Sequence, residues 1–430
     1  MEQPFQTPLN VAIIGGGLVG LLAARVLREQ HTVTVYERSQ HGGEYGAALG
    51  FGPSVTAILN SLDFDRTRVQ ACSMALTLAY NKQGELIFTR DTNMVRQKLS
   101  VTGEYLLSYR KDLYTEFLRL ATMPSQDLSV TGQPATIMYG KEAVRVDTES
   151  GDVSFADGSS VRADLVVGAD GIKSVIRPFI VGDTAFTTAR PTGLSAFRFV
   201  LEREKVVEAF GSVPRPLQAD QPVLMTICDA ADGTRRFSNC YPCRNFGLLN
   251  VVCMVPDSSL KQPTTESWTA DGDKDEMVSH FADFPNWVQE YLRLAEAPKI
   301  WQLRDQDPLP TYVRGRAIIV GDAAHSMTPH QGQGATQGIE DAEAFRLFLS
   351  PPASRAVTRD QVPDILMDID AVRRPRASQV QANTRLVASP DRPTEDIIRH
   401  MKFNWIYEGI VEAKQNLGKT ANGQDNESST

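Results

Sequence analysis

The sequence predicts an α/β fold in which a parallel sheet flanked by helices is joined to a second, sheet-based domain and to C-terminal helices. Two observations lead to this prediction. The chain opens with two apolar, strand-like runs that are separated by a glycine-rich turn and a helical pattern, as in a βαβ unit. A further apolar run and a glycine-rich turn precede a long helical pattern that begins near residue 334. The first domain is therefore expected to be assembled from segments that lie far apart in the chain.

The opening segment is expected to form a strand at 11–14, a helix at 18–29 and a strand at 32–36. A signal peptide or membrane anchor is the alternative for the apolar run at 11–27. Four glycines interrupt that run, no Lys or Arg precedes it, and a second strand follows it. The sequence therefore predicts no targeting signal and no membrane contact.

Glycines occupy the turn between the first strand and the helix. Gly15 permits the tight turn, Gly17 lets the backbone approach a pyrophosphate, and Gly20 brings the helix against the strand. Glu37 closes the next strand, where a carboxylate accepts hydrogen bonds from ribose hydroxyls. This Rossmann-like unit predicts dinucleotide binding and leaves the identity of the dinucleotide open.

The composition excludes several classes of partner. The chain has 430 residues, of which 42% are hydrophobic. Its net charge is -8, so no excess of basic residues is available to bind nucleic acid or anionic lipid. Its five cysteines are too few for a disulfide framework, which favours a reducing, cytoplasmic compartment. Cys240 and Cys243 form a CYPC pair, and a redox dithiol or half of a zinc site is the alternative to two packed strand cysteines. Oligomeric state is not predicted.

The pattern of helix-like and strand-like segments changes along the chain. Helices are expected at 108–123, 334–349, 364–385 and 395–417, and buried strands at 165–167 and 317–320. The first domain is predicted in two parts, 1–181 and 301–350, and the substrate domain at 182–300. A segment near 75–100 within the first part is expected to join the substrate domain. C-terminal helices are expected at 351–418 and a disordered tail at 419–430.

The segment at 321–342 decides which dinucleotide is expected. It reads GDAAHSMTPHQGQGATQGIEDA and places Asp322 at a strand end, followed by a glycine-rich turn directly before a helix. Together with GGGLVG at 15–20 and Glu37, and with GADGIKSVIR at 168–177, it resembles the three motifs of the class A FAD-dependent monooxygenases. These are the para-hydroxybenzoate and salicylate hydroxylase-like enzymes. The likeness covers roughly residues 10 to 385, and within the family the sequence most resembles the fungal enzymes of secondary metabolism.

The resemblance implies one noncovalently bound FAD. By motif, Glu37 would bind the adenosine ribose and Asp322 the ribityl chain. Gly50 in GAALGFGPS would touch the FAD, and Arg110 in YRKDL would reach the flavin side.

Further implied contacts lie around the flavin ring. Backbone near Gly334 and Ala335 would face the pyrimidine ring, where a helix dipole stabilises negative charge, and Pro329 would lie against the ring. Asp170, with Gly171 and Arg177, would form the fingerprint that the family uses for FAD and nicotinamide contacts. The alternative for this segment is a strand-end turn with a surface arginine.

The resemblance also implies the reaction. NAD(P)H would reduce the FAD, O2 would add to give a flavin C4a-hydroperoxide, and a small electron-rich aromatic substrate would be hydroxylated or epoxidised. The expected substrate is a phenolic polyketide or an indole alkaloid in fungal secondary metabolism. Arg198 in SAFRFVL and Tyr241 in NCYPCR resemble the family's paired active-site arginine and tyrosine, and would hold the substrate as an anion. An exposed strand arginine and a half-buried tyrosine are the alternative.

Other interpretations remain open at this point. His325 and His330 suggest a metal site. They lie in a loop rich in glycine and proline that supplies no cysteine or carboxylate as a further ligand, so no metal is predicted. Another FAD oxidoreductase of the same fold, a non-catalytic flavoprotein, and an NAD-dependent dehydrogenase that uses only the first unit are the rival functions. Thr336 and Asn245-Phe246 depart from residues that are common in the family, which bears on substrate rather than cofactor.

Overall fold

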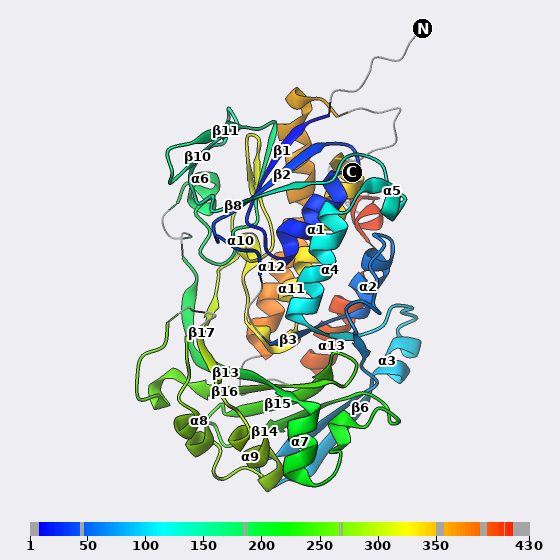
Figure 1. Ribbon diagram of the computed structural model, residues 1–430, viewed down its shortest axis with the longest axis vertical. Coiled ribbons are helices and arrows are strands. Elements are labelled where there is room, and N and C mark those ends of the chain that lie inside the picture. Colours follow the sequence, from blue (N-terminus) through cyan, green and yellow to red (C-terminus); the bar gives the residue numbers. More distant parts are fainter. Residues whose placement is uncertain are drawn as a thin grey trace, which may run out of the picture.

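Two large sheets divide the molecule along its long axis (Figure 1). The computed structural model describes residues 8–43, 47–183, 186, 188–265, 267, 270–349, 357–387, 394–407 and 409–415. A six-stranded sheet with its helices lies at the end where the chain begins, and a seven-stranded sheet lies at the opposite end. The tail expected to be disordered lies outside the described residues. Within the described ranges, no helix is both long and apolar enough to cross a membrane.

The six-stranded sheet confirms the predicted α/β fold. Val11 pairs with Val33 on one side and with Leu165 on the other, and all neighbours are parallel except at the β18 edge. Its strands, in spatial order, are β18 (Val313–Arg314), β19 (Ala317–Ile319), β12 (Leu165–Gly168), β1 (Asn10–Ile14), β2 (Thr32–Glu37) and β8 (Thr136–Tyr139).

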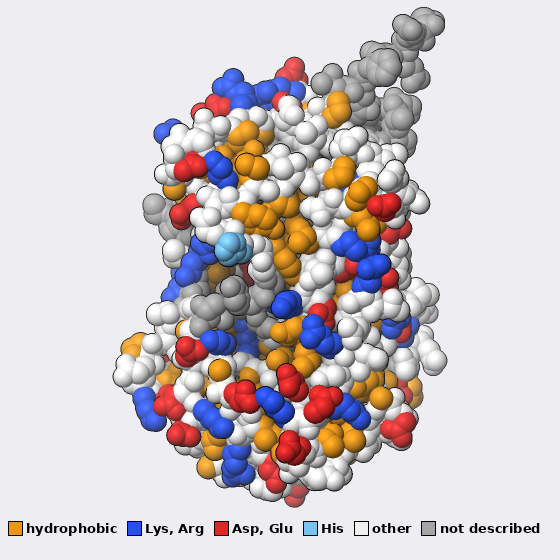
Figure 2. Space-filling model, in the orientation of Figure 1, with side chains coloured by type: hydrophobic (Ala, Val, Ile, Leu, Met, Phe, Trp, Pro, Cys, Tyr) orange, Lys and Arg blue, Asp and Glu red, His pale blue; other side chains and the backbone are white. Residues whose placement is uncertain are grey.

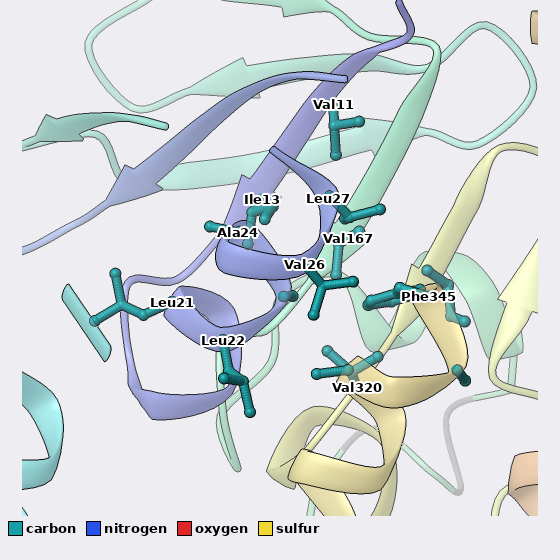
Figure 3. Packing of buried hydrophobic residues seen from close by; sticks show 14 of the residues in the cluster. Val11, Ile13, Leu21, Leu22, Ala24, Val26, Leu27, Val167, Val320 and Phe345 are labelled. Carbon is teal, nitrogen blue, oxygen red and sulfur yellow. The ribbon is translucent and has the colours of Figure 1, made fainter. Parts of the chain in front are cut away.

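Helices pack closely against this sheet. Gly338 lets α11 (Gly334–Leu349) cross α1 (Leu18–Leu27), because a Cβ at that position would lie 2.3 Å from Val19 Cγ2. Figure 3 shows side chains of both helices, among them Val26 and Phe345, in one cluster with Ile13 and Val167 of the strands. The other helices of this part are α2 (Pro53–Asn60), α4 (Arg110–Thr122), α5 (Ser125–Leu128), α6 (Arg177–Val181), α10 (Asp322–His325) and α12 (Val362–Val387).

The seven-stranded sheet has one covered face and one face toward the first sheet. Phe197 and Cys240 pack with Met277 of α8 and Leu292 of α9, and alternate residues of a strand point to opposite faces. Arg198 and Tyr241 therefore lie on the inner face. The strands, in spatial order, are β17 (Lys299–Asp305), β13 (Arg190–Glu202), β16 (Leu248–Pro256), β15 (Phe237–Cys243), β14 (Leu224–Asp229), β5 (Leu76–Asn81) and β6 (Leu86–Asp91). Its helices are α3 (Thr92–Lys98), α7 (Arg203–Phe210), α8 (Lys274–His280) and α9 (Asn286–Arg293).

Two small sheets and a last helix complete the fold. The first sheet holds β3 (Ala48–Phe51), β7 (Leu106–Tyr109) and β4 (Cys72–Ser73), and the second holds β9 (Ala143–Asp147), β10 (Asp152–Phe155) and β11 (Ser160–Arg162). The helix predicted at 395–417 is wrong in extent, because α13 (Thr394–Trp405) ends at Trp405. Gly409 takes a φ of 101°, which no right-handed helix allows, and Glu343 accepts hydrogen bonds from Tyr407 and from the Ile410 amide.

Candidate active site

A cavity of about 280 Å³ opens at the carboxyl ends of β1, β2 and β12. Ligands of doubly wound sheets bind at this edge. Cations and acids both line the cavity, so it can take a molecule that carries phosphate and hydroxyl groups. Residues predicted at the cofactor that do line it are Gly15, Gly17, Glu37, Arg110 and Asp170.

The glycine turn leaves no room for side chains. A Cβ at Gly15 would lie 2.4 Å from Ala169 O, and one at Gly20 would lie 2.0 Å from Gly15 O. Helix α1 begins at Leu18 without a side-chain cap at Gly17, so the first amides of the helix face the cavity without a capping partner. Amides and a helix dipole arranged in this way bind a pyrophosphate.

Glu37 is held in place at the cavity wall. Its Oε2 accepts a hydrogen bond from the Gly16 amide and its Oε1 accepts one from the Ser39 amide, each at 2.8 Å. Asp170 Oδ2 accepts from the Val175 amide at 2.7 Å, and burial raises the pKa of this carboxyl above its ordinary value. Both carboxylates are thus fixed by backbone amides before any ligand arrives.

Arg177 connects the segment at 168–177 with the segment at 321–342. It is fully buried, and its guanidinium donates hydrogen bonds to the carbonyls of Ile172, Asp322 and Ala323 at 2.7 to 3.1 Å. The alternative of a surface arginine is therefore wrong. Asp322 in turn lies beside the start of α11, since a Cβ at Gly334 would be 3.8 Å from its Oδ1. The two segments thus lie side by side at the strand ends.

Strand β3 reaches the glycine-rich turn before α11. A Cβ at Gly332 would lie 3.6 Å from Gly50 O and 3.1 Å from the Tyr105 hydroxyl. A Cβ at Gly50 would lie 2.7 Å from the Tyr105 ring. Pro329 stands exposed in a short 3-10 turn just before, and Ala335 is partly exposed in the first turn of α11. Gly50, Asp322 and Gly334 thus surround one region beyond the cavity.

Side chains of the seven-stranded sheet clamp β3 at Ala48. The Tyr241 hydroxyl donates to Ala48 O at 3.0 Å, and Asn250 Oδ1 accepts from the Ala48 amide at 2.9 Å. Burial raises the pKa of Tyr241 above its ordinary value, and nearby Cys243 and Tyr105 add to the increase. Since its proton is engaged with Ala48, Tyr241 positions the strand that carries Gly50.

Arg198 lies on the inner face of the same sheet with Trp301 beside it. Its guanidinium carbon is 3.1 Å from the centre of the Trp301 ring. Burial lowers the pKa of Arg198 well below its ordinary value, and the nearby Arg110 lowers it further. The positive charge of Arg110, which belongs to the other end of the molecule, therefore contributes to the electrostatic surroundings of Arg198.

No metal centre appears among the described residues. His325 Nε2 instead forms a 2.7 Å hydrogen bond with Asp341 Oδ2 in the interior. Cys240 and Cys243 are free and buried, and burial raises the pKa of both thiols, to about 12 for Cys240. A high thiol pKa makes a reactive dithiol unfavourable, so the two cysteines pack as strand residues.

A family model described as an FAD binding domain matches residues 8–384. The chain belongs to this family of FAD-dependent aromatic hydroxylases. Salicylate hydroxylase from Pseudomonas putida is 30% identical over 385 residues, which cover 87% of this chain and 84% of the relative. Hispidin-3-hydroxylase from Neonothopanus nambi is 29% identical, with 88% of each chain covered. A solved salicylate hydroxylase substrate complex superposes with a TM-score of 0.72 at 26% identity and covers 95% of this chain and 98% of that one. The protein is an FAD-dependent monooxygenase.

The residues present fit FAD. The uncapped start of α1 and the close glycines suit a pyrophosphate, and Glu37 suits a ribose. Sequence reasoning missed two residues that contact the candidate site, Asn250, which binds Ala48, and Trp301, which packs on Arg198. An asparagine inside the apolar strand LLNVVCMV was a usable signal for the first, whereas nothing in the sequence marked Trp301.

Replacing Glu37 or Asp322 with alanine should lower the FAD content of the purified hydroxylase. Each change removes a carboxylate that would accept hydrogen bonds from hydroxyls of the cofactor, at a cost of about 1.5–3 kcal/mol, or about 10- to 150-fold in Kd. Flavin absorbance per protein and fluorescence titration of the apoprotein with FAD measure the effect. Exposed Glu149→Ala is the control, and unchanged affinity in both variants would remove these carboxylates from the cofactor site.

Proposed function

We propose that this monooxygenase uses NAD(P)H and O2 to hydroxylate a phenolic substrate that binds as an anion near Arg198. The observation that carries the proposal is the Arg198 guanidinium, which lies over the Trp301 ring on the inner face of the seven-stranded sheet, where the positive charge of Arg110 also lowers its pKa. Burial and the charge of Arg110 both disfavour the charged guanidinium, and an anion bound beside it would offset both costs. A phenolate oxygen or a carboxylate on an aromatic ring meets this requirement.

The chemistry divides between cofactor and protein. FAD, which the first amides of α1 and Glu37 would hold, would supply the redox chemistry: two electrons from NAD(P)H and the activation of O2, with one oxygen atom going to the aromatic ring and the other to water. Arg198 holds the substrate oxygen as an anion, which makes the ring electron-rich at the reacting carbon. Trp301 keeps the guanidinium in place from one side. Tyr241 and Asn250 hold β3 at the boundary through Ala48.

The relatives support a phenolic substrate. Salicylate and hispidin, the compounds in the names of the two relatives, are both phenols, and each relative matches this chain over most of its length. The net charge of -8 offers no general attraction for a polyanion. Lysine, arginine, aspartate and glutamate are mixed on the face shown in Figure 2, without a broad basic patch.

The test is isotope incorporation from 18O2. FAD-loaded protein is supplied with NADH or NADPH and with a panel of phenols and indoles, and products are analysed by mass spectrometry. We expect a phenol to accelerate NAD(P)H oxidation and to gain one labelled oxygen atom. NAD(P)H oxidation that yields only hydrogen peroxide with every phenol, or oxygen that comes from water, would contradict the proposal.

A further inference from the structure

A second arginine of the inner face, Arg90 on β6, lacks a carboxylate partner. Its Nη2 donates to Thr77 Oγ1 at 3.1 Å, while its Nε is buried without a hydrogen-bond partner. Among the described residues no ion pair with Arg90 is formed. Burial lowers the pKa of Arg90 below its ordinary value, and Tyr105 partly offsets this. A desolvated guanidinium with one neutral partner is costly, so the position favours an anion.

The carboxylates next to Arg90 and next to Tyr105 in the chain have other partners. Asp91 caps helix α3 and accepts from the amides of Asn93 and Met94 at 2.8 and 3.0 Å. Glu104, which precedes Tyr105, accepts from the Ser73 hydroxyl at 2.8 Å and forms an ion pair with Arg66. Neither acid therefore neutralises Arg90 from within the chain.

Arg90 lies on the same face of the sheet as Tyr241. Cys240 pairs with Thr226, so the adjacent residues Tyr241 and Met225 lie together on the opposite face. Direct pairs continue on that face from Met225 to Thr77 and from Thr77 to Arg90. That face is the one that clamps β3. The anion that Arg90 favours would therefore lie between the seven-stranded sheet and the FAD-binding part.

Aromatic side chains connect Arg90 with the region around Gly50. Tyr105, which is coupled electrostatically to Arg90, lies against Gly50 and the turn at Gly332. The Trp405 ring of α13 is 6.1 Å from the Tyr105 ring, centre to centre, and only 4% of Trp405 is exposed. The Tyr105 carbonyl accepts a hydrogen bond from the Met74 amide at 2.8 Å, three residues before Thr77, which pairs with Arg90. Tyr105 thus connects the strands at Arg90 with the Trp405 ring, and the two rings offer an apolar surface that suits the aliphatic or aromatic part of a ligand.

Arg90 and Arg198 are far apart on the face. β6 and β13 are separated by five strand-to-strand steps in the sheet order, which corresponds to about 24 Å between their backbones at about 4.8 Å per step. A single-ring substrate held by Arg198 is too short to reach Arg90. Only a molecule with a long substituent or an extended ring system can contact both.

We propose that Arg90, with Tyr105 and Trp405, forms a second subsite that binds a carboxylate at the distal end of an extended phenolic substrate. The proposal rests on the proposed function, because it takes the phenol end to lie at Arg198. The site would then accept elongated phenolic acids and hold them at both ends. Small phenols would use Arg198 alone.

The test uses ω-(4-hydroxyphenyl)alkanoates of increasing chain length and their neutral primary amides. Each compound is titrated into oxidised, FAD-loaded protein by calorimetry. We expect the wild type to prefer carboxylate over amide about 10- to 100-fold at long chain lengths, the value of one charge-assisted contact, and to show no preference at short lengths. Arg90→Gln should abolish the preference without weakening amide binding, and Arg90→Lys should restore part of it.

A charge-matched control is Arg68→Gln, since the Arg68 side chain is 58% exposed. It should keep the wild-type preference, and FAD absorbance with thermal unfolding verifies that each variant is folded. A preference that persists in Arg90→Gln, or that is absent from the wild type, overturns the subsite, as does a lack of binding by every probe. Failure of 18O incorporation while the Arg90-dependent preference remains would overturn the proposed function and leave the subsite standing.

Discussion

Replacing Arg373 with leucine should lower the free energy of unfolding by about 3–5 kcal/mol, because it removes the cation that two buried carboxylates share and leaves Glu340 with Arg376 and Asp341 with His325. Arg373 Nε donates to Asp341 Oδ1 at 2.9 Å, and its Nη1 donates to Glu340 Oε2 at 2.6 Å. No more than 5% of any of these side chains is exposed. Burial alone would raise the pKa of Asp341, yet His325 and Arg373 outweigh it and hold that pKa below its ordinary value.

The same change should loosen the cofactor site. Asp341 Oδ2 accepts hydrogen bonds from the Gly321 amide at 2.9 Å and from His325 Nε2 at 2.7 Å. Gly321 has a φ of 60° and directly precedes Asp322, so the ion pair supports the turn that presents that carboxylate. We therefore expect weaker FAD binding as well as lower stability.

Urea unfolding of the apoprotein and FAD titration measure the two effects separately. Arg190→Leu is the control, because Arg190 is 70% exposed in its ion pair with Asp307 and should change stability by at most about 1 kcal/mol. A loss below about 1 kcal/mol in Arg373→Leu would show that Arg376 and His325, or protonation, are enough to compensate the buried carboxylates.

The parts of the fold and site that follow from local sequence were predictable. The glycine turn, the strand before it and Glu37 lie within 30 residues, and their spacing alone specifies a nucleotide-binding βαβ unit. The predicted α11 and the strand before Asp322 were found for the same reason. The sequence could not show that Arg373 pairs with residues 32 and 33 positions away, or that Asn250 binds Ala48 across 202 positions.

Side-chain environment was the other missing information. The sequence left Arg198 as either an exposed strand residue or an active-site cation, and the packing of its guanidinium on Trp301 argues against the exposed residue. Arg177 was taken for a surface residue in one interpretation, although its five donors let it tie two motifs together from a buried position. Burial of a charged residue depends on distant partners, which local patterns do not contain.

Arg198→Ala should reduce turnover about 30- to 1000-fold while FAD content stays unchanged. The variant removes a charge-assisted contact to the substrate anion in a water-poor site, worth about 2 to 4 kcal/mol by analogy with oxyanion donors. Arg198→Lys should recover only part of the loss, because an ammonium lacks the planar fork that stacks on Trp301 and holds two oxygens.

Lys299→Ala is the matched control, since Lys299 pairs directly with Arg198 across the sheet but is 45% exposed. Steady-state NAD(P)H oxidation with a phenol, flavin absorbance and thermal unfolding are measured on all three variants. If Arg198 only packs its aliphatic stem against Trp301, Arg198→Ala should lower the melting temperature and leave turnover nearly normal. Near-wild-type turnover in Arg198→Ala would therefore remove Arg198 from the substrate site, whereas lost turnover with retained FAD identifies it as the residue that holds the substrate anion.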